Sequence, residues 1–184
     1  DYVFDGESDK PYIETDETNP INVYGKTKLA GEKALKKAMS TSAIIIRTSW
    51  VYSEFSNNFV KTMIRLGKDR DEVSVVSDQI GSPTYATDLA GVILKIIDNK
   101  AYQNKEQPTK TYHYSNEGEI SWYDFAKEIF KLANIECKVN PIKTEQYPTL
   151  AERPKKTTLK IDSSFNQRKY KESLKSVLRV LSAL

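Results

Sequence analysis

A tyrosine and a lysine four residues apart, Tyr24 and Lys28, could form an acid–base pair on one helix. On an α-helix this spacing places both side chains on the same face, one turn apart. An ammonium held near a phenol favours the phenolate and lowers the tyrosine pKa from its ordinary value of about 10. A tyrosine tuned in this way can donate a proton to a carbonyl oxygen as hydride reaches the carbon. The lysine can also bind the ribose hydroxyls of a nicotinamide cofactor.

The spacing alone is not specific, because a chain with 11 tyrosines and many lysines contains such pairs by chance. A second pair, Tyr123 and Lys127, has the same spacing. We interpret the second pair as part of an amphipathic helix with Lys127 in solvent. Tyr24 and Lys28 share a mostly small or apolar stripe with Gly31, which we interpret as an inward-facing stripe. The first pair is therefore the candidate catalytic pair.

The charged residues are balanced and interleaved, which argues against a nucleic-acid partner. The 184 residues include 28 lysines and arginines and 25 aspartates and glutamates, for a formal net charge of +3. Nucleic-acid binders carry a basic stripe or a much larger excess of basic residues. With 39% hydrophobic and 29% charged residues, the composition is that of a globular domain and not of a disordered or collagen-like chain.

The single His113 and the single Cys137 restrict metal and disulfide chemistry. One cysteine forms no internal disulfide or multi-cysteine zinc site, and one histidine excludes multi-histidine metal sites. We predict no metal ligand among the candidate residues and interpret Cys137 as a small core hydrophobe and His113 as a strand-face side chain. No apolar run approaches the ~18 residues that span a membrane, and no signal peptide is visible. We therefore expect no membrane partner and a reducing, cytoplasmic location.

The elements that must position these residues alternate between strands and helices. Asn19 followed by Pro20 is typical of a helix start, and the β-branched run from Ser42 to Arg47 is typical of a buried parallel strand. Alternation predicts an α/β fold with mostly parallel strands. Strands are expected at 1–4, 42–47, 73–76, 111–114 and 137–142, helices at 20–39, 58–68, 87–99, from 121 onward and at 172–184, a loop at 78–84 and a polar link at 104–110.

Five stretches together carry a resemblance to a known family. They are Asp1–Gly6, Asn19–Glu32, Arg47–Tyr52, Asp78–Thr84 and Arg153–Pro154. In this order they resemble the dTDP-4-dehydrorhamnose reductase family of the extended short-chain dehydrogenase/reductases, over nearly the whole chain. The resemblance implies NADPH as hydride donor, with NADH as the other choice, and a dTDP-linked 4-keto deoxysugar as substrate. The implied reaction reduces the C4 keto group of dTDP-4-dehydro-L-rhamnose to dTDP-L-rhamnose.

The resemblance also implies roles for the residues around the candidate pair. Tyr24 would protonate the oxygen at sugar C4, and Lys28 would tune Tyr24 and hold the nicotinamide ribose. Asp1 and Tyr2 match the stretch that lies beside the sugar. Trp50 matches a substrate-contacting tryptophan, whose ring can pack on a sugar face and donate one hydrogen bond; a core tryptophan is the structural alternative.

Five further residues are candidates for contacts to cofactor or substrate. Thr48 and Ser49 would lie near the nicotinamide, with strand-end capping as an equal alternative. The planar fork of Arg153 suits a diphosphate, and the amide of Gln79 suits a sugar hydroxyl or a base edge. Asn58 is the remaining substrate-binding candidate. For Asn58, Gln79 and Arg153 the alternative is a loop residue bonded to nearby backbone.

The chain departs from the family pattern in ways that predict a C-terminal portion of a longer enzyme. It contains no glycine-rich turn for a cofactor pyrophosphate, and the family's catalytic Ser/Thr would fall before Asp1. We therefore expect the chain alone to bind NADPH poorly and to turn over little. An open sheet edge would invite pairing with another chain, and the sequence leaves a homodimer through that edge open. Thr157 and Lys160 replace the usual Ser and Asp near the substrate, and a divalent metal at a subunit contact is left open.

The predicted architecture is the C-terminal part of a Rossmann-like parallel sheet with an interleaved small α/β substrate-binding lobe. Residues 1–52 and 84–115 would belong to the NADP-binding part, and residues 53–83 and 116–184 to the lobe. Two alternatives stay open. One is another nucleotide-sugar epimerase or reductase of the same superfamily, and the other is a non-catalytic regulatory subunit with this fold.

Overall fold

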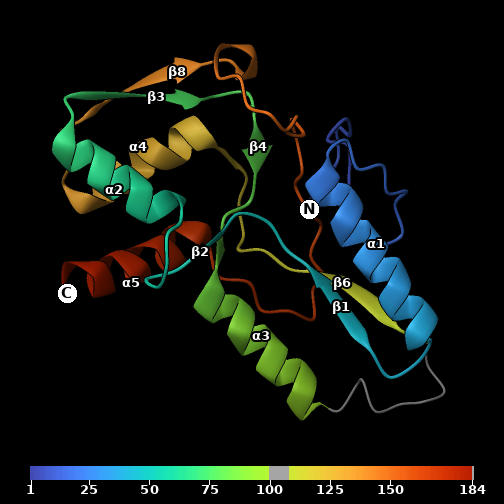
Figure 1. The fold of residues 1–184 in the computed structure, drawn as a ribbon. Helices are drawn as coiled ribbons and strands as arrows, with labels where there is room; N and C mark the ends of the chain where they lie inside the picture. The colour runs from blue at the N-terminus through green and yellow to red at the C-terminus, as the bar shows by residue number, and fades with distance from the viewer. Residues whose placement is uncertain (100–107, 184) are drawn as a thin grey trace.

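The computed structural model describes residues 1–99 and 108–183 (Figure 1). Most of the predicted link at 104–110, and Leu184 at the end of the predicted last helix, lie outside the described residues. The helices are α1 (Val23–Ala38), α2 (Phe59–Asp69), α3 (Ala86–Asp98), α4 (Trp122–Ala133), the short η2 (Thr144–Gln146) and α5 (Tyr170–Ser182). The strands are β1 (Ile44–Arg47), β2 (Val51–Tyr52), β3 (Glu72–Val76), β4 (Ile80–Gly81), β5 (Thr84–Tyr85), β6 (Lys110–His113), β7 (Ile120–Ser121) and β8 (Lys138–Ile142).

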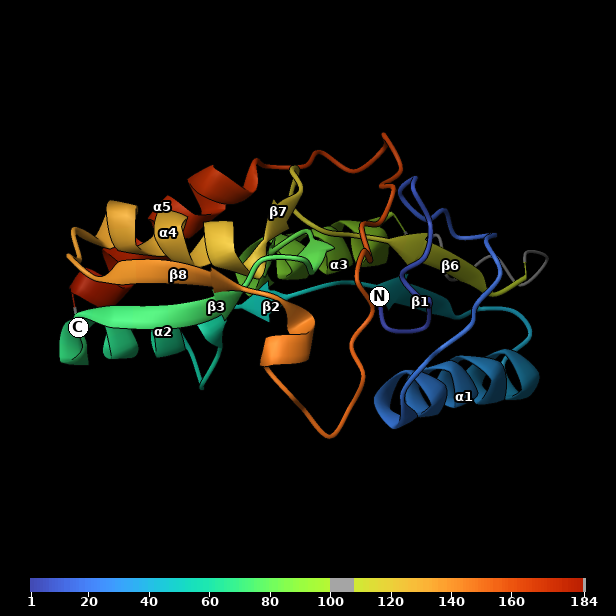
Figure 2. The same ribbon diagram turned by 90° about the horizontal axis from the view of Figure 1, so that it is seen from above.

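The described strands pair two by two, and three of the four pairs are parallel. β1 runs parallel to β6, β2 to β5 and β3 to β8, whereas β4 and β7 are antiparallel. Figure 2 shows β1, β6 and α1 at one end of the molecule and β3, β8, α2, α4 and α5 at the other. The predicted α/β class with mostly parallel strands is confirmed.

Buried apolar side chains form two clusters, one at each end. The smaller one consists of Val3, Phe4, Tyr12 and Leu159, with Phe4 and Tyr12 stacked at 4.1 Å between ring centroids. The larger one fills the space between α2, α4, α5 and β3. Its fully buried members include Tyr52, Val60, Phe125, Ala126, Ile129, Leu174 and Val177.

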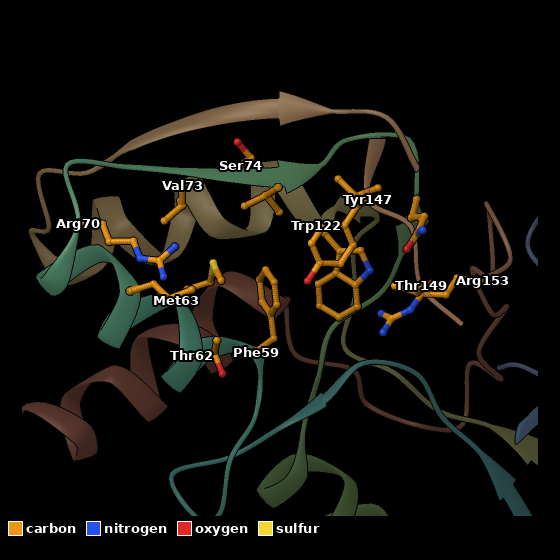
Figure 3. A pocket seen from close by; sticks show the side chains of 14 residues that line it. Phe59, Thr62, Met63, Arg70, Val73, Ser74, Trp122, Tyr147, Thr149 and Arg153 are labelled. Carbon is orange, nitrogen blue, oxygen red and sulfur yellow. The ribbon is translucent and has the colours of Figure 1, made fainter. Parts of the chain in front are cut away.

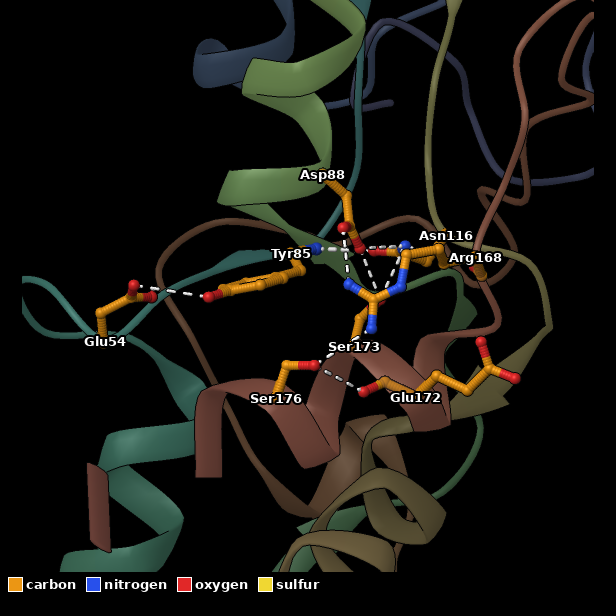
Figure 4. A network of polar contacts seen from close by, with 8 residues as sticks. All are labelled: Glu54, Tyr85, Asp88, Asn116, Arg168, Glu172, Ser173 and Ser176. Atoms are coloured by element: carbon orange, nitrogen blue, oxygen red, sulfur yellow. Dashed lines mark hydrogen bonds and ion pairs between the residues drawn. The ribbon is translucent and has the colours of Figure 1, made fainter. Parts of the chain in front are cut away.

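A polar network joins α3 to α5 between these ends (Figure 4). The Asn116 amide, which is fully buried, donates to the Asp88 carboxylate at 2.7 Å and to the Ser173 hydroxyl at 3.0 Å, and its oxygen accepts from the Tyr85 amide at 2.7 Å. Arg168 donates to the same carboxylate at 3.0 Å. Because every branch is hydrogen-bonded, the network fixes the start of α3 against α5.

The structure differs from three of the predicted elements. The first helix is capped by Asn22 and not by Asn19 and Pro20, since the Asn22 side chain accepts from the Gly25 amide. Residues 1–4 form a turn closed by the Phe4 amide and the Asp1 carbonyl at 3.1 Å, because no neighbouring described strand pairs with them. The predicted loop at 78–84 contains β4 and the start of β5.

Candidate functional site

The candidate pair Tyr24 and Lys28 lies on the first two turns of α1, on a face open to solvent. The Lys28 ammonium lies 5.3 Å from the centre of the Tyr24 ring, so the spacing brings the two side chains together as predicted. Tyr24 is 58% exposed and Lys28 is also exposed, so the interpretation of an inward-facing stripe is wrong. Among the described residues, neither the Tyr24 hydroxyl nor the Lys28 ammonium has a hydrogen-bond partner. The pair is therefore available to a ligand.

The same geometry occurs in the second pair, where the Lys127 ammonium lies 4.9 Å from the centre of the Tyr123 ring. The surroundings separate the two pairs. Tyr123 packs at the edge of the larger core. The Tyr24 ring instead meets the Tyr2 ring edge to face at 5.7 Å. An acid–base function needs a phenol that a substrate can reach, and this distinguishes Tyr24.

The turn at residues 1–4 sits directly against the start of α1. A Cβ atom added to Gly25 would lie 2.1 Å from the Tyr2 carbonyl oxygen, so glycine is required for this close approach. Burial raises the pKa of the Tyr2 phenol, and the nearby Arg153 guanidinium offsets part of the rise. Tyr2 stays protonated at neutral pH and is suited to hydrogen-bonding as a neutral phenol.

The other candidates at this end of the molecule are held by short polar contacts. The Asp1 carboxylate accepts from the Thr157 hydroxyl at 2.7 Å, so the departure from the usual Ser retains a hydroxyl donor. Thr48 donates to the Thr84 hydroxyl at 3.3 Å, and the buried Ser49 hydroxyl donates to the Ser82 carbonyl at 2.6 Å. Ser49 thus closes the loop that follows β4, as strand-end capping requires.

Trp50 follows the carboxyl end of β1 in an unusual backbone conformation. Its φ is +48°, in the left-handed region of the backbone that few residues other than glycine adopt. Its ring stacks on Trp122 at 3.5 Å between centroids, and a Cβ atom on Gly81 would lie 2.6 Å from it. Phe59 lies against the other side of Trp122 at 4.5 Å. Sequence reasoning missed Trp122 and Phe59, because nothing in their local pattern distinguishes them from core aromatics.

A cavity of about 500 Å³ opens beside this aromatic stack. Figure 3 shows Phe59 and Trp122 on its floor and the guanidinium groups of Arg70 and Arg153 at opposite ends. The described lining also contains Thr62, Met63, Leu66, Val73, Ser74, Val75, Val76, Gln79, Tyr147 and Thr149. An apolar floor with a few polar groups and a guanidinium at each end suits an aromatic ligand that carries negative charge.

The structure brings Gln79 and Arg153 together in this cavity, whereas Asn58 is not among the described lining residues and has a capping role. The buried Gln79 amide donates to the Thr144 hydroxyl at 3.2 Å and keeps its oxygen for another donor. Arg153 is exposed to solvent. Asn58 caps α2, with its oxygen accepting from the Lys61 amide at 3.2 Å and its amide donating to the Ser53 carbonyl at 2.7 Å. The acceptor and the donor of the Asn58 side chain are thus both hydrogen-bonded within the protein.

Arg47, the last residue of β1, is buried and forms an ion pair with α1. Arg47 makes two hydrogen bonds to the Glu32 carboxylate, at 2.9 and 2.8 Å, which fixes α1 against β1. His113 ends β6, where Arg47 lies 3.4 Å from its Nε2 and the Tyr12 carbonyl lies 3.1 Å from its Nδ1. Burial lowers the pKa of His113 to about 4, so the ring is neutral at pH 7. Cys137 packs at the edge of the larger core.

Within residues 1–99 and 108–183, none of the helices has the length and apolar character required to cross a bilayer. In the same ranges no three His, Cys, Asp or Glu side chains gather so that they could hold a metal ion.

The chain is similar to known proteins over nearly its whole length. The family model described as the RmlD substrate binding domain matches residues 1–183. A dTDP-4-dehydrorhamnose reductase from Aggregatibacter actinomycetemcomitans is 46% identical over 175 residues, which are 90% of this chain and 58% of that protein. A crystal structure of a dTDP-4-dehydrorhamnose reductase from Clostridium acetobutylicum matches with a TM-score of 0.90 and 47% identity over 98% of this chain and 63% of that one.

The enzyme of the same name from Bacillus anthracis, solved in complex with NADP, matches with a TM-score of 0.89 and 43% identity. It is matched over 97% of this chain and 63% of its own. The chain thus spans about three fifths of the length of these relatives. The resemblance carried by the five sequence stretches is confirmed. With a family model that covers all but its last residue, the chain belongs to the RmlD substrate-binding domain family.

Proposed function

We propose that the full-length gene product containing this chain reduces the C4 keto group of dTDP-4-dehydro-L-rhamnose with NADPH. The observation that carries the proposal is the exposed pair on α1, where the Lys28 ammonium lies over the Tyr24 ring and neither polar group has a described partner. The names of the relatives and the NADP in one of them agree with this assignment. NADH is the other candidate for the hydride donor.

The exposed groups on α1 fit a nicotinamide cofactor. A ribose offers two neighbouring hydroxyls, and a phenol and an ammonium on one helix face supply matching donors and acceptors. Tyr24 and Lys28 would hold that ribose, with Thr48 and Ser49 at the carboxyl end of β1 near the nicotinamide. When bound, the cofactor supplies the hydride. Tyr24 would give its proton to the C4 oxygen, and Lys28 would stabilise the resulting phenolate.

The cavity is the proposed site for the nucleotide part of the substrate. Its volume of about 500 Å³ lies within the range of ligand pockets. Arg153 would bind the diphosphate, and Gln79 would offer its free oxygen to a base edge or sugar hydroxyl. Asn58 would hold the start of α2, where Phe59 lines the cavity. The sugar would lie across Trp50 toward Asp1 and Tyr2, and the Tyr2 ring meets that of Tyr24.

Several broader features belong to the same proposal. We place the enzyme in the cytoplasm, without a nucleic-acid partner, and assign residues 1–52 and 84–115 to the NADP-binding part. Residues 53–83 and 116–184 would form the substrate-binding lobe. The larger buried cluster takes all its buried members except Tyr52 and Tyr85 from these ranges, which supports the assignment, whereas Leu159 of the lobe packs in the smaller cluster. Pairing of two copies through an open sheet edge would give a homodimer, which sedimentation of the full-length protein tests directly.

The test compares Tyr24→Phe with Tyr123→Phe in the full-length gene product. NADPH oxidation is followed with dTDP-4-dehydrorhamnose as substrate. General acid catalysis contributes about 10²–10⁴-fold, so loss of the Tyr24 hydroxyl should reduce kcat by that factor. Tyr123→Phe removes a hydroxyl with the same lysine geometry and should leave kcat unchanged. If the wild type binds the sugar nucleotide without oxidising NADPH, the reductase assignment fails, and an epimerase or regulatory subunit takes its place.

A further inference from the structure

Asn22 uses every polar atom of its side chain to join two distant parts of the chain. Its Oδ1 accepts from the Gly25 amide at 2.8 Å and caps α1, two positions before Tyr24 in the first turn. Its Nδ2 donates to the Glu152 carbonyl at 2.8 Å, 130 positions further along the sequence. Asn22 is 6% exposed; its hydrogen bond with Gly25 is buried, and the one to the exposed Glu152 is partly buried. A cap alone needs the oxygen and leaves the amide nitrogen without a function.

Glu152 belongs to a connecting segment, residues 147–153, that forms one wall of the cavity. Tyr147, Thr149 and Arg153 of this segment line the cavity (Figure 3). The preceding Thr144 is held by the Asp78 carboxylate, which accepts from its amide at 3.0 Å and its hydroxyl at 2.8 Å.

After the segment, the Ile80 amide donates to the Lys155 carbonyl at 2.7 Å. Between these two anchors, the described hydrogen bond from an outside side chain to the backbone of the segment is the one from Asn22. The exposed side chains of Tyr147 and Leu150 show that the segment itself is not packed into the core.

We propose that Asn22 is a positioning residue that couples occupancy of the cavity to the first turn of α1. The inference rests on the proposed function, because the occupant is the nucleotide part of the substrate. A diphosphate bound by Arg153 orders the 147–153 segment, and the neighbouring Glu152 carbonyl then holds the Asn22 amide in place. Oδ1 and Nδ2 belong to one planar amide, so holding Nδ2 at Glu152 also orients Oδ1 toward Gly25. The turn that carries Tyr24 therefore becomes ordered when the nucleotide is present.

The coupling has a reciprocal consequence. If nucleotide binding orders the α1 turn through Asn22, an intact Asn22 must in turn favour nucleotide binding. One buried neutral hydrogen bond corresponds to about a 2- to 10-fold change in an equilibrium constant. Serine is as good a helix cap as asparagine but has no second arm to reach Glu152. Asn22→Ser therefore separates the capping role from the link to the segment.

The experiment measures dTDP binding and amide hydrogen exchange in the full-length gene product. In the wild type, dTDP should slow exchange of the Gly25 amide. In Asn22→Ser that slowing should be absent, and the Kd for dTDP should rise about 2- to 10-fold. Asn19→Ser is the matched control, since the exposed Asn19 amide donates to Asp5 at 3.1 Å and has no link to the 147–153 segment. It should behave as the wild type does.

Three results would decide between the possibilities. If Asn22→Ser keeps both the wild-type Kd and the dTDP-dependent protection of Gly25, the coupling is refuted. A variant that loses thermal stability yet keeps that protection shows Asn22 to be a structural cap alone, which also refutes it. If the wild type binds no dTDP, the proposed function fails at its first step, and the coupling fails with it.

Discussion

Replacing Gly25 by alanine tests whether the close approach of residues 1–4 to α1 positions Tyr24. The new Cβ atom would lie 2.1 Å from the Tyr2 carbonyl oxygen and 2.9 Å from the Pro20 Cβ. Both neighbours belong to short, hydrogen-bonded segments, and the nearest atom is backbone. The carbonyl must therefore move by more than about 1 Å to reach an ordinary contact of 3.4 Å.

Two opposing effects set the size of the change in stability. Alanine is a better helix former than glycine by about 1 kcal/mol. Overpacking a tight contact costs about 1–3 kcal/mol. We expect Gly25→Ala to lower the free energy of unfolding by about 1 kcal/mol in net terms. A displacement of about 1 Å at a catalytic group costs about 10²-fold in rate, so kcat should fall far more than stability alone explains.

Gly31→Ala is the matched control on the same helix. No atom outside the helix lies within 4 Å of a Cβ at this position, so the helix-forming gain is unopposed. This variant should raise the free energy of unfolding by about 0.5–1 kcal/mol. Urea unfolding and NADPH oxidation by the full-length gene product measure both quantities. Equal stabilities for the two variants, or an unchanged kcat for Gly25→Ala, would refute the reasoning.

Further predictions concern a buried and an exposed ion pair, the titration of His113 and the side chain of Arg153. Glu32→Gln leaves Arg47 buried without its carboxylate and should cost about 3–5 kcal/mol in urea unfolding. Glu72→Gln, at a solvent-exposed pair, should cost less than about 1 kcal/mol. The pKa of His113 is lowered to about 4, below its ordinary 6.5, so its contribution to stability is complete above pH 6.5 and is lost as the pH falls toward 4. An NMR titration of this single histidine with a midpoint near 6.5 would contradict that. Arg153→Lys loses the planar fork and should raise the Kd for dTDP about 10-fold by calorimetry, whereas an unchanged Kd would remove Arg153 from the diphosphate site.

The sequence predicts best those features that depend on local chemistry. The Ser121 hydroxyl caps α4 by accepting a 3.0 Å hydrogen bond from the Asp124 amide. The position of Ser121 before an amphipathic run indicates this cap. The pairing of Tyr24 with Lys28 also follows from helix geometry alone. The fold class follows from the alternation of strands and helices. In each case the determining atoms lie within a few residues of one another.

The features that the sequence does not predict depend on contacts between distant segments. Asn19 followed by Pro20 is a good local helix start, yet the helix begins after Asn22. The structure shows what favours the later cap, because the Asn22 amide also bonds Glu152 from another part of the chain. The stripe containing Tyr24 is small and apolar enough to suggest burial, yet Tyr24 is exposed, and the described ring that contacts it is that of Tyr2. The cavity likewise combines residues from α2, β3, α4 and the 147–153 segment, whose proximity no local pattern encodes.

The backbone of Trp50 gives a physical reason to place the substrate between the two parts of the site. A non-glycine residue in the left-handed region costs about 1–3 kcal/mol and persists where its surroundings impose it. Here the surroundings are the stack on Trp122 and the close contact with Gly81. Trp50 directly follows Thr48 and Ser49 at the end of β1, and Trp122 lines the cavity. The strained residue therefore joins the end of the strand near the proposed nicotinamide to the floor of the proposed nucleotide site, which is where our proposal puts the sugar.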